Sequence, residues 1–479
     1  MSQREITEKH RSWLSAEISA WQEQGIISPD HAASIWDLYV TPAQSAERRR
    51  NWARFTLLTL ATLMIGIAVL LVIGYNWQDL GRALKLSVIS GAILGAHGAG
   101  LCLRRLPHAR VASELLFFLG CLCYGAAIWL IAQIFNINSH YPDGVWYWAV
   151  GVLPFALCLD TLLFHCLYAS LLATWVGCET LGFSHPLHLM FSPWRIPLPA
   201  SYSLPLMVLP GIVWAYRKRS PLTLAIYLAV VAWWVVLYPL SWEMHFDPMC
   251  WLAALGGMYL LIAMIHRPGN KMARPFDILG VAMVLAGLVP QSFADYQCLY
   301  RSDFNAKGFG IYTGIFFILA GLISALCLAY RAKKAQIGQN EAPSSIASSL
   351  VPLAAPLLIV WTMGFLSIWH GLMYTYDVAY RSYDHYSQWT YPTLTPVVIV
   401  NVLMVAFAVW LMAIGMKRDR VAVFSLGVAY FLLWTVIRYF DLFSGIAGML
   451  GAAVLFLICG LLLYVVARIW QHRKEIAHV

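Results

Sequence analysis

The apolar stretches of this chain constrain its fold more than any other feature, because about fourteen of them are long enough, or nearly long enough, to cross a membrane. About 20 apolar residues in a helix span the hydrocarbon core of a bilayer. Charged residues make up only 11% of the chain, against roughly 25% in soluble domains. The sequence therefore predicts an all-α, polytopic helical bundle in a membrane, since a helix satisfies its own backbone hydrogen bonds in lipid. The expected spans are 55–75, 84–102, 111–135, 145–159, 163–183, 201–216, 221–239, 249–265, 276–292, 309–330, 350–371, 394–416, 420–437 and 446–467.

Lys and Arg residues are distributed unevenly over the gaps between these spans. If the gaps alternate between two sides, twenty-five of the 32 Lys and Arg residues fall on the side that holds both termini. Cytoplasmic loops keep positive charge because translocating it is costly, so the pattern predicts a multipass inner-membrane protein with both termini in the cytoplasm. The exceptions on the other side are Arg82, Lys85, Arg195, Arg301, Lys307, Arg381 and Arg438.

The net charge of +9 has the same explanation. Most of the positive charge stands in short clusters beside apolar spans, such as Arg217 to Arg219. That placement indicates membrane lipids as partners and argues against nucleic acid.

The chain divides into five predicted parts. Leu14, Ile18 and Trp21 recur at helical spacing, Gly25 is placed to end that helix, and Ser28 precedes a Pro at the start of a second one. The spans 145–159 and 163–183 are separated by a short linker that contains Asp160 and no basic residue, so these two could be a tight hairpin or a re-entrant pair. The parts are a cytoplasmic helical hairpin at 1–54, a first membrane bundle of about ten spans at 55–330, a flexible cytoplasmic linker at 331–349, the last four spans at 350–467 and a cytoplasmic tail at 468–479.

The N-terminal third carries a recognisable set of short motifs. They are Trp21 to Ser28, Ala33 to Tyr39, Gly74 to Trp77, Ile131 to Asn136, and Trp146 to Asp160 with Gly151 and Leu153-Pro154. Over about residues 13–165 the chain resembles a family of bacterial multipass membrane proteins catalogued as domain of unknown function 2157. That resemblance implies a multipass membrane protein and no established activity. The family usually has a basic residue near the position of Asp160, whereas this chain has Leu159-Asp160-Thr161.

Several ionisable residues on the predicted outer side are candidate substrate-binding residues. Arg438 and Asp441 stand at i, i+3 where a span meets the interface, and Asp377 and Arg381 stand at i, i+4 beside a stripe of Tyr residues. Asp295 lies in another outer loop. Ionisable groups in or near a membrane are energetically costly unless they are paired, and those that are present often have a function. Arg438 and Asp441 could equally be a structural pair that orients the last two helices, and the Tyr stripe could belong to the aromatic belt of the membrane.

Two acidic residues are expected within spans. Glu179 near the outer end of span 163–183 completes the candidate set, whereas Glu114 follows Arg110 by four residues and is expected to pair with it. No metal site is predicted, because His140, Asp143, His245 and Asp247 would form one only if the fold gathered them.

The sequence contains no Walker A motif, no GxSxG and no HExxH, so no cofactor and no enzyme of these classes is predicted. We expect a transporter or flippase-like protein for a small solute or lipid. An envelope enzyme that acts on a lipid-linked substrate at the periplasmic face stays open as an alternative. A non-catalytic assembly or sensory component with a membrane or periplasmic protein partner is a third possibility.

Overall fold

The part of the chain described by the structure, a computed structural model, is discontinuous. It comprises residues 4–5, 8–36, 39–40, 57, 60–61, 64, 81–106, 108–137, 140–159, 161–181, 186–188, 195–238, 247–266, 270–293, 296, 306–337, 344–379, 391–417 and 420–444.

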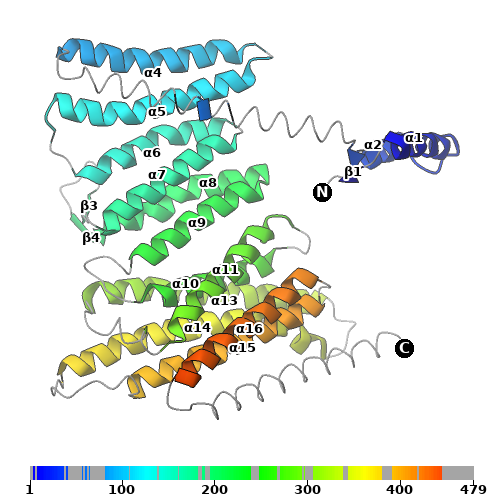
Figure 1. Cartoon of the computed structure of the whole chain (residues 1–479), viewed down its shortest axis with the longest axis vertical. Coiled ribbons are helices and arrows are strands. Elements are labelled where there is room, and N and C mark those ends of the chain that lie inside the picture. Colours follow the sequence, from blue (N-terminus) through cyan, green and yellow to red (C-terminus); the bar gives the residue numbers. More distant parts are fainter. Residues whose placement is uncertain are drawn as a thin grey trace. The chain divides into compact units, whose positions relative to one another are not determined.

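Fourteen α-helices lie within these residues (Figure 1). They are α1 (Glu8–Glu23), α2 (Pro29–Trp36), α4 (Arg82–Arg104), α5 (Arg110–Ile134), α6 (Tyr141–Cys158), α7 (Leu162–Leu181), α8 (Leu204–Lys218), α9 (Pro221–Leu237), α10 (Pro248–Ile265), α11 (Ala273–Gln291), α13 (Ala306–Ile337), α14 (Ser344–Ala379), α15 (Tyr391–Lys417) and α16 (Val421–Ser444). The twelve from α4 onward each overlap one predicted span, in order. The predicted spans 55–75 and 446–467 lie outside the described residues, apart from four helical positions in the first.

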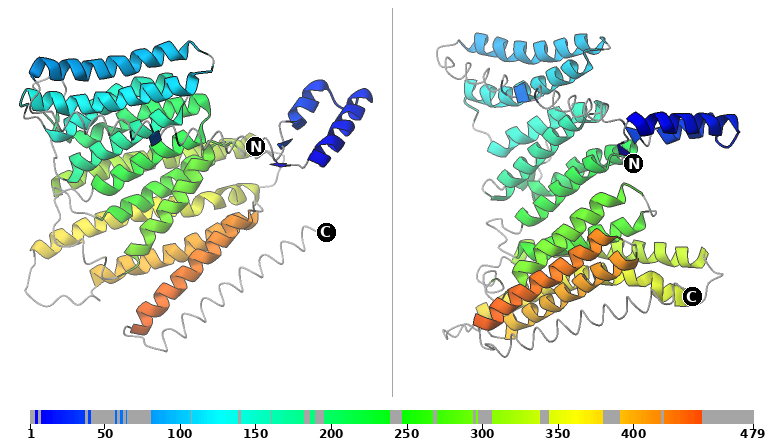
Figure 2. Two further views of the ribbon diagram at one scale, coloured as in Figure 1. Left: turned by 45° about the horizontal axis from the view of Figure 1, so that its top comes forward. Right: turned by 45° about the vertical axis from the view of Figure 1, so that its right-hand side comes forward.

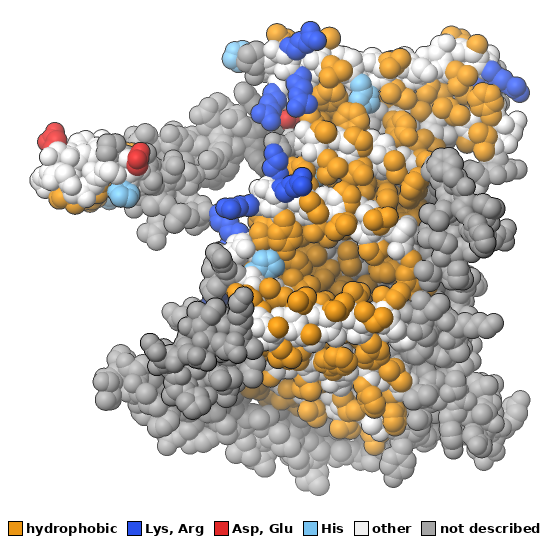
Figure 3. All heavy atoms as spheres, turned by 180° about the vertical axis from the view of Figure 1, so that it is seen from behind, with side chains coloured by type: hydrophobic (Ala, Val, Ile, Leu, Met, Phe, Trp, Pro, Cys, Tyr) orange, Lys and Arg blue, Asp and Glu red, His pale blue; other side chains and the backbone are white. Residues whose placement is uncertain are grey.

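Nine helices of the described part are long and apolar enough to cross a membrane, by length and composition. They are α4, α5, α7, α10, α11, α13, α14, α15 and α16. Among the side chains that are coloured in Figure 3, hydrophobic ones predominate over the central part of the face shown. The strands are short: β1 (Arg4–Glu5) pairs with β2 (Tyr39–Val40), and β3 (Pro186–His188) pairs with β4 (Arg195–Pro199). The predicted helical membrane bundle is confirmed.

The chain forms two compact units, residues 1–139 and residues 140–479. The first unit begins with the α1–α2 hairpin, which has the caps that the sequence predicts. Gly25 adopts a φ of 70° after α1, and the Ile26 amide donates to the Trp21 carbonyl at 2.9 Å. Ser28 accepts a hydrogen bond at its Oγ from the His31 amide at 3.3 Å, as expected of a residue that caps α2.

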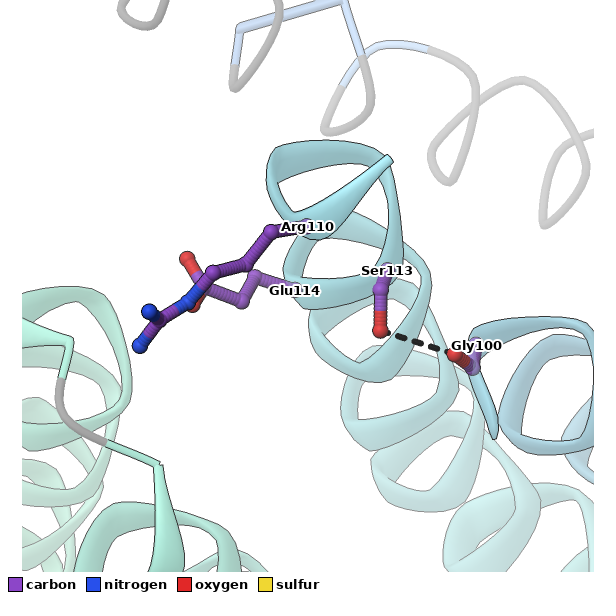
Figure 4. A network of polar contacts seen from close by, with 4 residues as sticks. All are labelled: Gly100, Arg110, Ser113 and Glu114. Carbon is purple, nitrogen blue, oxygen red and sulfur yellow. Dashed lines mark hydrogen bonds and ion pairs between the residues drawn. The ribbon is translucent and has the colours of Figure 1, made fainter. Parts of the chain in front are cut away.

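Helices α4 and α5 pack together in the first unit. The Ser113 hydroxyl on α5 donates to the Gly100 carbonyl on α4 at 2.7 Å, and both residues are buried. Arg110 and Glu114 project from another side of α5, with Arg110 Nε 3.3 Å from Glu114 Oε1 (Figure 4). The predicted pair between these two residues is confirmed.

The second unit contains α6 to α16. Helices α6 and α7 pack against each other, so the two segments on either side of Asp160 form a helical hairpin. Helix α10 contacts α11, α13 and α14, and α15 lies beside α16 (Figure 2). Bulky side chains fill the core, among them Phe164, Tyr227, Trp251 and Phe407, each fully buried.

Residues 331–349, the predicted flexible linker, are mostly helical. Helix α13 continues to Ile337 and α14 begins at Ser344, while residues 338–343 lie outside the described part of the structure. Ala, Lys and Gln in this stretch are good helix formers, so helix propensity explains why the helices extend beyond the apolar spans.

Glycines allow α10 and α11 to approach closely. A Cβ at Gly256 would lie 2.8 Å from the Gly280 carbonyl oxygen, and a Cβ at Gly287 would lie 2.8 Å from the Met249 carbonyl oxygen. Small residues at such positions let helix backbones meet in a membrane, where van der Waals packing drives association. The α10–α11 pair is therefore a close backbone contact of the second unit.

We expect Gly256→Ala to lower the melting temperature of the purified protein in detergent, because the new methyl group would press on the backbone of α11. Overpacking of this kind costs about 1–3 kcal/mol. Gly91→Ala on α4 is the matched control, because a Cβ there has nothing within 4 Å. The control should be neutral or slightly stabilising, since Ala favours a helix over Gly. Equal melting temperatures for the two variants would contradict the close packing.

Candidate functional site

Four helices of the second unit, α10, α11, α15 and α16, combine a buried polar cluster with an apolar groove. We call them the four-helix group. Helix α11 contacts both α10 and α15, and α15 contacts α16. The polar cluster lies at the start of α10, at the end of α11, in the first half of α15 and near the end of α16, and the groove lies toward the opposite ends of these helices.

Arg438 on α16 is the centre of the polar cluster. The residue is 7% exposed, and its guanidinium donates to the Ser292 carbonyl at 3.0 Å and to the Ser292 hydroxyl at 3.3 Å. Its Cζ also lies 4.8 Å from the centroid of the Phe293 ring. Ser292 follows the last residue of α11, where unpaired carbonyls give the helix end a partial negative charge. The arginine therefore neutralises the end of α11.

Asn401 on α15 joins the same carbonyl. Its Nδ2 donates to the Ser292 carbonyl at 3.2 Å, and its Oδ1 accepts from Trp434 Nε1 of α16 at 2.8 Å. The Ser292 carbonyl thus accepts hydrogen bonds from two other helices. Three helices are fixed to one another at this point.

Asp247 places a buried acid in the cluster. It is 4% exposed, and its Oδ1 accepts from the Met249 amide and from the Tyr296 hydroxyl, each at 2.8 Å. As the N-cap of α10 it faces the partial positive charge of a helix start. One turn on, Cys250 Sγ donates to Gln291 Oε1 at 3.2 Å, next to Ser292. The cluster therefore contains a buried carboxylate and a buried guanidinium linked through α11.

The structure places the six candidate residues of the sequence in different ways. Arg438 lies in the polar cluster. Glu179 lies elsewhere, buried on α7. Asp441 and Asp377 fall on α16 and α14, but their side chains lie outside the described part of the structure. Arg381 and Asp295 also lie outside it, so the predicted Arg438–Asp441 and Asp377–Arg381 pairs remain predictions.

Sequence reasoning missed Ser292, Gln291 and Asn401 as members of the cluster. A lone Asn in the very apolar span 394–416 was a usable signal, because such residues form interhelical hydrogen bonds in membranes. Asp247 followed by Pro248 was a second usable signal, since Asp favours the N-cap of a helix and Pro favours its first position. The Ser292 carbonyl gives no signal in a sequence.

The groove has a volume of about 390 Å³, within the range of small-molecule sites. Among the residues that the structure describes, Asp277 and Arg420 are its only charged lining residues, and Ile278, 67% exposed, is one of its most open. Arg438 and Glu179, two of the candidate residues of the sequence, do not line it. The lining is Leu260 and Met264 of α10; Asp277, Ile278, Val281, Ala282 and Leu285 of α11; Trp410, Leu411 and Ile414 of α15; Arg420; and Val423 and Leu426 of α16.

The comparison with protein families found one match, to the family described as "Predicted membrane protein (DUF2157)", over residues 19–164. The resemblance predicted for about residues 13–165 is thereby confirmed. The matched segment contains α2, α4, α5 and α6 and stops before the four-helix group begins. The searches of curated proteins and of solved structures found no similar chain. The match supports a membrane location and assigns no activity.

We expect Arg438→Gln to lower the melting temperature of the protein in detergent by several degrees, because the charged hydrogen bonds that join α16 to α11 are lost. Hydrogen bonds to charged groups contribute about 1.5–3 kcal/mol each. Arg217→Gln, at an exposed position of α8, removes the same charge without a buried contact and should have no effect. An Arg438→Gln protein as stable as the Arg217→Gln control would show that Arg438 does not hold these helices.

Proposed function

We propose that this protein is a transporter or flippase-like protein that binds a lipid in the groove of the four-helix group. The observation that carries the proposal is the groove itself, which is apolar and has one acid and one arginine at the same end. A soluble polar solute would find few partners along its walls. An amphiphile fits both parts, because its chains can lie along the apolar residues while its head group meets the charges.

The two charges favour a zwitterionic head group. The guanidinium of Arg420 suits a phosphate, which it can bind through two parallel hydrogen bonds. The carboxylate of Asp277 suits an ammonium group. A phospholipid with a primary amine, such as phosphatidylethanolamine, carries both groups and is therefore the lipid class we expect.

The arrangement along α16 places charged residues near both ends of the four-helix group. Arg420, directly before α16, and Arg438 near its end are 18 residues apart, which is about 27 Å along a helix. That distance approaches the hydrocarbon thickness of a bilayer, about 30 Å. Arg420 lies toward the same end of the group as Asp277 of α11. Arg438 lies toward the same end as Asp247, the N-cap of α10. The group is thus long enough to place the charges of the groove near one membrane face and the buried polar cluster near the other.

We further propose that the Arg420 end faces the cytoplasm of a bacterial inner membrane. Lys271, Arg274 and Lys417 lie at the same end of the group, as the positive-inside rule requires of a cytoplasmic face. With the alternating spans of the sequence, both termini are then cytoplasmic.

Reporter fusions test this orientation. Green fluorescent protein fused to either terminus should fluoresce, and alkaline phosphatase at the same positions should be inactive, because each reporter works on only one side of the membrane. Active phosphatase at either terminus would overturn the orientation.

Lipid movement is tested with the full chain in phosphatidylcholine vesicles that contain fluorescent phosphatidylethanolamine. We expect the wild type to move the labelled lipid between leaflets. Ile278→Trp should lower the transfer rate roughly tenfold, because a loss of about 1.4 kcal/mol in binding free energy weakens lipid binding tenfold. Val402→Trp is the matched control. It is on α15, 62% exposed against 67% for Ile278, and does not line the groove.

The control should keep the wild-type rate. If both variants or neither were slowed, the groove would not be the path. A labelled lipid that reached the other leaflet chemically altered would favour the envelope-enzyme alternative. A wild type that moved no lipid would contradict the transport proposal.

A further inference from the structure

A second group of ionisable side chains lies at one end of the α6–α7 hairpin, away from the groove. His140 is the N-cap of α6, Asp143 lies in its first turn, and Glu179 lies in the last turn of α7. One ligand atom from each residue lies within 4.8 Å of the other two. Glu179 is separated from the other two by most of the hairpin, so only the packing of α6 on α7 brings the three together.

The distances between these atoms suit a bound metal ion. His140 Nδ1 lies 3.2 Å from Asp143 Oδ1 and 3.5 Å from Glu179 Oε1. Zinc binds His nitrogen and carboxylate oxygen at about 2.0–2.2 Å with tetrahedral geometry, which separates the ligand atoms by roughly 3.3–3.6 Å. The observed distances are close to these, so an ion would enter with little rearrangement.

The charges also favour a cation. Glu179 is 3% exposed and belongs to a helix apolar enough to cross a membrane, where an uncompensated carboxylate is costly. Asp143 brings a second carboxylate to the same imidazole nitrogen. A protonated His140 would supply one positive charge and one Nδ1 proton for two acceptors. A divalent ion supplies two charges and bonds to all three residues.

The backbone holds the ligands in place and leaves one side open. The Asp143 amide donates to the His140 carbonyl at 3.1 Å, which fixes the turn that carries both residues. The Asp143 side chain is 50% exposed, whereas that of Glu179 is 2% exposed. An ion could therefore enter past Asp143 and keep a water in its fourth position, as three-ligand zinc sites do.

We propose that His140, Asp143 and Glu179 bind a divalent transition-metal ion, with zinc as the best fit, and that the ion joins the start of α6 to the end of α7. This site is independent of the lipid groove and of its proposed function. Neither the family match nor the sequence motifs assign it.

The test is a titration of the purified full chain with zinc chloride, after removal of bound metal with a chelator. We expect one equivalent to bind and to raise the melting temperature. Glu179→Gln and Asp143→Asn should each weaken binding by at least roughly tenfold. Asp143→Asn is the safer variant for folding, because this side chain is half exposed.

Glu114→Gln is the control, because Glu114 is an acid at a helix start that pairs with Arg110 and not with His140. It should bind zinc like the wild type. X-ray absorption of the zinc-loaded wild type should show nitrogen and oxygen ligands without sulfur, which excludes the cysteines. A wild type that binds no zinc, or binding that survives both Asp143→Asn and Glu179→Gln, would overturn the proposal and leave a hydrogen-bonded triad.

Discussion

The contact between the Arg438 guanidinium and the Ser292 carbonyl determines how the four-helix group is assembled. A helix end buried in a membrane exposes carbonyls that water cannot reach, and a buried arginine needs acceptors. Each group satisfies the other here, and Asn401 adds a third helix to the same carbonyl. Helices α11, α15 and α16 are thus fixed at one end by polar contacts. Toward the other end their facing residues are mostly apolar, and the groove lies among them.

Local features of the sequence predicted much of this structure. Length and apolarity located the helices from α4 to α16, because a span must bury its backbone in lipid whatever it packs against. Gly25, Ser28 and the Arg110–Glu114 pair were predictable, because their partners lie within one or two helical turns. The extension of α13 and α14 into residues 331–349 was not predicted. The polar composition of this stretch was interpreted as a flexible linker, although several of its residues favour a helix.

The candidate sites were less predictable, because their partners are distant in the sequence or belong to the backbone. The sequence does not indicate that Arg438 donates to the Ser292 carbonyl at the end of α11, and its predicted pair with Asp441 stays a prediction because the Asp441 side chain lies outside the described residues. His140 and Asp143 were recognised together, but the residue that joins them is Glu179, which sequence reasoning treated as a separate intramembrane acid. Asp247 belongs to the cluster at α11 and not with His140. In each case the partner of a side chain depends on which helices pack together. Apolar spans of similar composition do not indicate which helices will be neighbours.

The central claim is that a lipid occupies the groove with its head group between Asp277 and Arg420. A density map of the protein in nanodiscs that contain phosphatidylethanolamine tests it most directly. The account predicts elongated density along Ile278, Val281 and Leu426, with head-group density in contact with Arg420. A groove filled by protein, or empty while lipids are resolved elsewhere around the helices, would contradict it.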